Sequence, residues 1–96
     1  MALLIDNAKF ENTDVTTSCY VRLQYQALKN GRTALVWLFP YISHTGYTEN
    51  KEIHTNLPKT LNITVGVDEQ QNLDVIHTHT KTALEAAGYN VIIDLT

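Results

Sequence analysis

The chain has 96 residues, of which 44% are hydrophobic and 18% charged, and its formal net charge is −3. This length suits one small hydrophobic core, so we expect a single domain over residues 1–96. The seven lysines and arginines form no basic run, which argues against nucleic-acid binding along a phosphate backbone. No apolar stretch approaches the ~20 residues of a membrane span, so we expect no membrane segment.

Residues 2–10 predict a short first strand that Asp6 and Asn7 end or kink, and a polar connection follows it. From Val15 the chain alternates between apolar and polar residues, as a half-buried strand does. Cys19 lies in this pattern and is the only cysteine, so no internal disulfide is possible. We interpret it as a small buried hydrophobic residue rather than a nucleophile.

Asn30-Gly31, between two apolar runs, predicts a β-hairpin over residues 15–42. A two-residue turn sets the pairing, although a longer loop would shift it by one residue. One face then carries the pairs Leu23–Leu38, Tyr25–Val36 and Ala27–Ala34. The other face carries Tyr20–Tyr41, Arg22–Phe39, Gln24–Trp37 and Gln26–Leu35.

After a predicted loop over residues 43–51, residues 52–57 suit a short edge strand and residues 60–67 alternate as a strand does. A helix is predicted at about 69–87, capped by Asp68 with Gln71 and closed by Gly88. Its apolar stripe comprises Leu73, His77, Thr80, Leu84 and Ala87. A short final strand follows. The predicted class is α+β, with an antiparallel sheet of four to five strands and the helix on one face.

The histidines predict no metal or catalytic site. His77 and His79 are two residues apart, so on a helix they point to different sides, whereas on a strand they would share a face. A histidine- or metal-dependent enzyme would need one of them to converge with His44 or His54. No phosphate loop, nucleophile motif or metal motif is present, so we expect no catalytic residues and no cofactor, and we predict that the chain is not an enzyme.

The second strand of the hairpin is apolar on both sides, which predicts a second apolar sheet face. Aromatic residues with arginine dominate the binding energy of protein interfaces. We therefore predict contact with other protein subunits, in a homo-oligomer or a hetero-assembly. The alternative is that the first strand or the 43–58 connection covers this face. The predicted interface residues are Tyr20, Arg22, Leu35, Trp37, Phe39 and Tyr41.

The opening "LLIDNAKFENTDVTTSCYVRLQY", the hairpin and the closing "AGYNVIIDL" resemble small proteins encoded among the virion-assembly genes of tailed bacteriophages and prophages. The resemblance lies in the pattern and order of elements over most of the chain. It implies a non-enzymatic structural subunit of the neck, tail, baseplate or capsid surface. Such a subunit would be assembled in the host cytoplasm and located in the virion. The alternative is a small oligomeric binding module of the bacterial cytoplasm.

Overall fold

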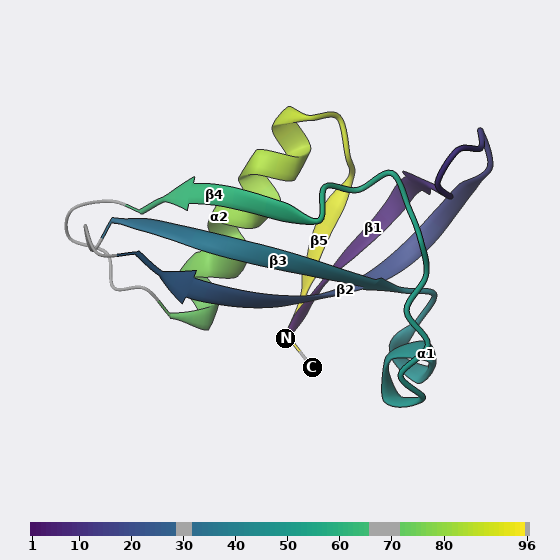
Figure 1. Cartoon of the computed structure of the whole chain (residues 1–96), viewed down its shortest axis with the longest axis horizontal. Helices are drawn as coiled ribbons and strands as arrows, with labels where there is room; N and C mark the ends of the chain where they lie inside the picture. The colour runs from purple at the N-terminus through teal and green to yellow at the C-terminus, as the bar shows by residue number, and fades with distance from the viewer. Residues whose placement is uncertain (29–31, 66–71, 96) are drawn as a thin grey trace.

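The computed structural model describes residues 1–28, 32–65 and 72–95 (Figure 1). Its strands form one antiparallel sheet in the order β4-β3-β2-β1-β5. This confirms the predicted α+β class, with a C-terminal helix on the sheet and a final short strand. The elements are β1 (Ala2–Lys9), β2 (Thr16–Ala27), β3 (Thr33–Tyr41), α1 (His44–Thr48), β4 (Thr60–Thr64), α2 (Leu73–Ala86) and β5 (Val91–Asp94).

The pairing of β2 with β3 has the predicted register, from Tyr20 opposite Tyr41 to Ala27 opposite Ala34. The Asn30-Gly31 turn from which the register was predicted lies outside the described residues. Since a shift of one residue would exchange the two faces of the strand, this register decides which side chains meet α2.

The hydrophobic core lies between α2 and one face of the sheet. Ile76 and Leu84 of α2 are buried together with residues of all five strands. Helix α2 packs against both edge strands, β4 and β5, so the sheet must curl around it. Figure 1 shows α2 passing behind β4 and alongside β5. The strand and connection residues in this core are Leu3, Ile5, Ala8, Cys19, Val21, Leu23, Ala34, Val36, Leu38, Leu57, Ile63 and Val91.

Side-chain and backbone caps define the ends of α2. Asn72 is its N-cap, and its side-chain oxygen accepts from the Val75 N–H at 3.0 Å. The predicted cap residues, Asp68 and Gln71, lie outside the described residues. At the other end Gly88 has a φ of 100°, and its N–H donates to the Glu85 carbonyl at 3.0 Å. This confirms that Gly88 closes the helix, because such a cap needs a residue that tolerates positive φ.

The predicted apolar stripe of α2 is partly wrong. His77, Thr80 and Leu84 are buried, but Ala87 is exposed and Leu73 is 54% exposed. Leu73 is the first helical residue, and side chains on a helix lean toward its N-terminus. Its side chain therefore points away from the body of the helix rather than into the core.

The predicted kink in the first strand is a β-bulge. Ile5 faces Cys19 and Ala8 faces Thr17, so β1 carries one extra residue in this interval. The Asn7 side chain donates to the Gly88 carbonyl at 2.9 Å and accepts from the Asn90 N–H at 2.8 Å. The bulge thus aims Asn7 at the turn between α2 and β5.

The connection between β3 and β4 differs from its prediction as a loop followed by an edge strand. Ser43 caps the short helix α1, its hydroxyl accepting from the Gly46 N–H at 3.3 Å. Residues 52–57 form no strand. The bridges Tyr41–Glu52 and Phe10–Thr55 tie them to the sheet, as does a hydrogen bond from the Lys9 N–H to the Asn56 side-chain oxygen at 3.1 Å. Pro58 follows at once and cannot donate to a strand ladder.

Within the described ranges, no helix has the length and apolar character needed to cross a membrane.

Candidate functional site

The sheet face opposite α2, here called the outer face, carries all six predicted interface residues. In an antiparallel pair, opposite residues project to the same side of the sheet. Leu23 and Leu38 pack in the core beneath α2, so their neighbours Arg22 and Phe39 project outward. The remaining outward pairs of β2 and β3 are Tyr20–Tyr41, Gln24–Trp37 and Gln26–Leu35.

One end of the outer face is covered by the chain itself. Tyr20 and Tyr41 are only 3% and 7% exposed, which corrects their assignment to an exposed interface. The Tyr47 ring of α1 lies 5.8 Å from the Tyr20 ring and 5.3 Å from the Tyr41 ring, between centroids. Of the two alternatives, the 43–58 connection therefore covers this end of the face.

Arg22 belongs to the same covered end. Its guanidinium carbon lies 4.5 Å from the centroid of the Tyr47 ring, and Nη1 donates to the Met1 carbonyl at 3.1 Å. Arg22 thus stacks on an aromatic ring, and that ring comes from α1. Because the guanidinium is already bound by Tyr47 and the Met1 carbonyl, Arg22 does not belong to the open part of the outer face.

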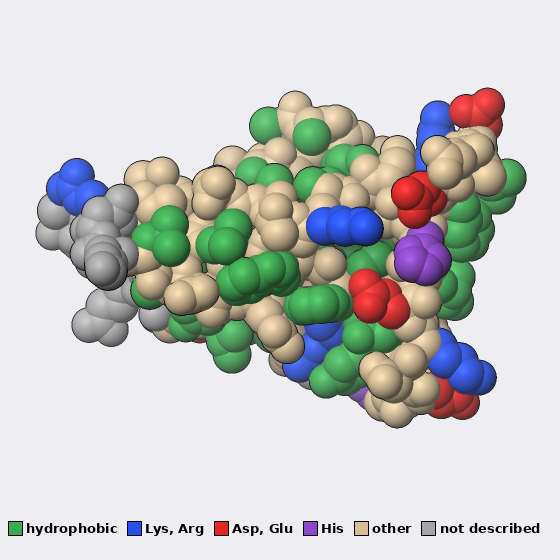
Figure 2. Space-filling model, in the orientation of Figure 1, with side chains coloured by type: hydrophobic (Ala, Val, Ile, Leu, Met, Phe, Trp, Pro, Cys, Tyr) green, Lys and Arg blue, Asp and Glu red, His purple; other side chains and the backbone are tan. Residues whose placement is uncertain are grey.

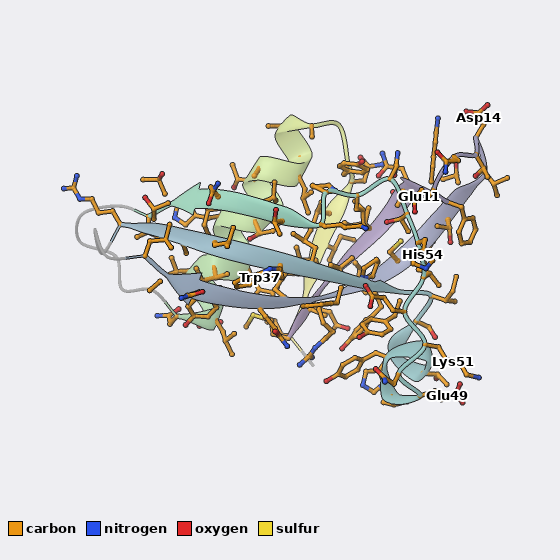
Figure 3. The ribbon with its side chains drawn as sticks, in the orientation of Figure 1. Glu11, Asp14, Trp37, Glu49, Lys51 and His54 are labelled. Atoms are coloured by element: carbon orange, nitrogen blue, oxygen red, sulfur yellow. The ribbon has the colours of Figure 1, made fainter. Side chains whose placement is uncertain are left out.

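The other part of the outer face remains open. Leu35, Trp37 and Phe39 are half-buried, whereas Ala34, Val36 and Leu38 on the opposite side of β3 are buried. We call these three half-buried residues the Trp37 row. Figure 2 shows a band of hydrophobic side chains along the middle of this face, and Figure 3 places Trp37 within it. The exposed polar residues beside the row are Gln24 and Gln26 on β2 and Thr60, Asn62 and Thr64 on β4.

A groove of about 360 Å³ continues the Trp37 row past the start of β4. Trp37, Phe39 and Pro58 contribute apolar surface to it. Two backbone hydrogen bonds hold the connection beside β3, from Leu38 to the Lys59 carbonyl and from Ile53 to the Pro40 carbonyl, both at 3.0 Å. The titratable side chains that line the groove are Glu11, Glu52, His54 and Lys59.

A second groove, of about 420 Å³, lies on the outer face between the start of α1 and strands β1 and β5. Leu4, Ile42 and the 66%-exposed Ile92 line it. These three residues were absent from the predicted interface. Ile92 could have been found from sequence, since it alternates with the buried Val91 in the last strand.

The histidines do not converge. His77 is 1% exposed on the helix side, and its Nδ1 lies 2.7 Å from the Leu73 carbonyl. Burial lowers the pKa of His77. His44 packs edge-on against Tyr20 on the outer face, and His54 lines the groove beside Trp37. The described parts of the chain contain no group of three or more His, Cys, Asp or Glu side chains placed to hold a metal ion.

Cys19 is buried as expected. Burial raises the pKa of its thiol to about 11, so the thiol is protonated near neutral pH. A protonated, inaccessible thiol is a poor nucleophile, and this agrees with the interpretation of Cys19 as a core residue.

The chain matches no protein-family model, no curated protein and no solved structure.

Proposed function

We propose that this chain is a non-enzymatic subunit of a protein assembly and that it docks through the Trp37 row. The observation that carries the proposal is the incomplete burial of the apolar side chains on the outer side of β3. Three large apolar side chains are only partly buried and stand next to one another, on a strand whose other side is buried. Trp is among the residues that most often dominate binding energy, and its burial against a partner is strongly favourable.

The surroundings of the row support the same proposal. Protein interfaces have an apolar centre and a polar rim, and amides and hydroxyls flank the row on β2 and β4. The groove beside Phe39 and Pro58 offers a concave site for a partner's side chain. Aromatic centre, polar flank and adjoining groove together give this face the layout of a docking surface.

The narrower form of the proposal is a structural subunit of a bacteriophage particle, in its neck, tail, baseplate or capsid surface. It is supported by the sequence resemblance, and it implies a location in the virion. The alternative is an oligomeric binding module of the bacterial cytoplasm. Both forms use the Trp37 row, and they differ in the partner that covers it.

The test is incorporation into particles. The chain would be expressed with the products of its neighbouring genes, and the assemblies separated by sedimentation. Trp37→Ala should lower incorporation by about tenfold or more, because truncating a hot-spot residue typically costs 2 kcal/mol or more of binding. Leu73→Ala is the control, since it truncates an exposed apolar residue on the opposite side of the molecule.

Circular dichroism and thermal unfolding would show whether each variant is folded. A folded Trp37→Ala that enters particles as well as the wild type would contradict docking through the row. If Trp37→Ala fails to fold, Trp37→Gln would replace it, because Gln keeps the bulk of the side chain but removes the ring. Virion-gene products that never capture the folded wild-type chain would favour the cytoplasmic binding module.

A further inference from the structure

We propose that the occupant of the Trp37 row is a second copy of this chain, related by a two-fold axis, with Lys59 of each copy facing Glu52 of the other. This inference rests on the proposed function, because it names the partner of the same surface. It is carried by the charges and hydrogen-bonding groups that surround the row.

A two-fold contact uses the same patch on both subunits, so the patch must complement itself. Lys59 and Glu52 supply opposite charges within one groove. Neither forms an ion pair or a side-chain hydrogen bond within the described ranges, whereas Lys51 and Lys81 are each paired with a nearby glutamate. The groove therefore carries one unpaired positive charge and an unpaired negative charge that can meet their opposites on another copy.

The positions of these charges along β3 fix where the axis would pass. The Leu38 N–H bonds to the Lys59 carbonyl, and Glu52 forms a bridge with Tyr41. The two charged residues therefore lie beside β3 about three positions apart, or roughly 10 Å. An axis between them, over Phe39, brings each Lys59 to the partner's Glu52. The two β3 strands then run antiparallel across the contact, and the two Trp37 rows meet at their Phe39 ends.

The polar flanks of the row are self-complementary as well. An amide donates and accepts hydrogen bonds, and so does a hydroxyl. Gln24, Gln26 and Asn62 can therefore form hydrogen bonds with whichever polar groups of the second copy they meet. A flank carrying a single sign of charge would repel itself. The other titratable groups of the groove, Glu11 and His54, lie next to each other, and the Glu11 N–H donates to the His54 carbonyl at 3.1 Å. Figure 3 shows both toward the end of the molecule that carries Asp14.

The experiment exchanges the two charges. Lys59→Glu leaves only negative charge at both positions, and Glu52→Lys leaves only positive charge. Each variant should weaken its own dimer by about tenfold or more, since like charges placed together across an interface are unfavourable. An equal mixture should restore association, because each variant is then complementary to the other. Sedimentation equilibrium from micromolar concentrations to about 1 mM would measure the dissociation constants.

Matched controls separate this contact from an effect of net charge. Lys9→Glu and Asp14→Lys make the same charge changes on exposed residues of the β1–β2 hairpin, outside the groove. They should leave the dissociation constant within about threefold of the wild-type value. Circular dichroism would confirm that all four variants are folded.

The outcomes distinguish this inference from the proposed function. A wild-type chain that stays monomeric at about 1 mM overturns the two-fold contact. If that monomer still enters particles in a Trp37-dependent manner, the proposed function stands. A dimer unaffected by the charge exchanges, or one that the mixture fails to restore, also overturns the inference. A dimer that Lys59→Glu abolishes but Trp37→Ala leaves intact contradicts docking through the Trp37 row.

Discussion

Arg22 of β2 and Tyr47 of α1 are 25 positions apart in the chain, and the Arg22 guanidinium carbon lies 4.5 Å from the centre of the Tyr47 ring. The Tyr47 ring also packs on Tyr20 and Tyr41. A helix of five residues is too short to be stable alone, so these ring contacts must hold α1 against the outer face. They decide which part of the face is closed and which part remains open.

The first prediction concerns this attachment. Tyr47→Ala removes three ring contacts, with Tyr20, Tyr41 and His44, and the cation–π contact with Arg22, each of which contributes about 0.5–1.5 kcal/mol. We expect the free energy of unfolding to fall by roughly 1–3 kcal/mol in urea titrations. Tyr47→Phe keeps the ring and should stay within about 0.5 kcal/mol of the wild type. Equal stability of Tyr47→Ala and the wild type would show that other contacts hold α1.

The second prediction concerns the helix–sheet core. Leu84 is buried among strand residues, so Leu84→Ala should cost about 2–5 kcal/mol through lost burial and the cavity left behind. Leu73→Ala should cost less than about 0.5 kcal/mol, because Leu73 is largely exposed. Urea-induced unfolding of both variants measures the difference. Similar losses for the two variants would mean that α2 docks by another face.

Much of this core could be predicted because its signals are local. The alternation in residues 15–27 and the two-residue turn signal led to the observed β2–β3 register. Asn72 was missed as the helix cap because Asp68 and Gln71 offered an equally good capping pattern. Leu73 was misplaced because helical periodicity does not show where a helix end passes beyond the sheet.

For the outer face, the residues could be predicted from the sequence, but the covering of one end by α1 could not. Its six residues follow from the register, and all six lie there. Helix α1 could not be predicted from "HTGYT", because Gly and the β-branched Thr disfavour helix formation. Its position depends on ring contacts between residues far apart in the chain, as with Tyr20 and Tyr47. Sequence alternation therefore found the face but could not show that its Tyr20–Tyr41 end is closed.

The third prediction concerns the end of α2. Gly88 has a φ of 100°, which L side chains rarely adopt, although a Cβ there would meet no neighbouring atom. Gly88→Ala should therefore destabilise the chain by about 1–2 kcal/mol through backbone strain alone. Gly46→Ala is the matched control, because Gly46 lies in α1 without a positive φ and with ordinary packing distances.

The control should equal or exceed wild-type stability, because Ala favours helix over Gly by up to about 1 kcal/mol. Thermal unfolding under one set of conditions would compare the stabilities of Gly88→Ala and Gly46→Ala. A Gly88→Ala variant as stable as Gly46→Ala would mean that the cap does not require a positive φ.

The last prediction concerns the dependence of stability on pH. The His77 Nδ1 contacts the Leu73 carbonyl, while its Nε2 is buried and has no hydrogen-bond partner within the described ranges. Protonation would bury a charged ring with an unsatisfied N–H, and burial accordingly lowers the pKa of His77 below its ordinary value of 6.5. The unfolded chain therefore binds a proton at a higher pH than the folded chain does.

The direction in which stability changes with pH follows from that difference. The contribution of neutral His77 to stability is complete above about pH 6.5 and is lost as the pH falls through the lowered pKa of the folded state. Urea titrations between pH 8 and about pH 5 should show this loss in the wild type. His77→Gln, which cannot titrate, should flatten the dependence, whereas the exposed control His54→Gln should retain it. Equal slopes for wild type and His77→Gln would show that His77 is not the group that makes the fold sensitive to acid.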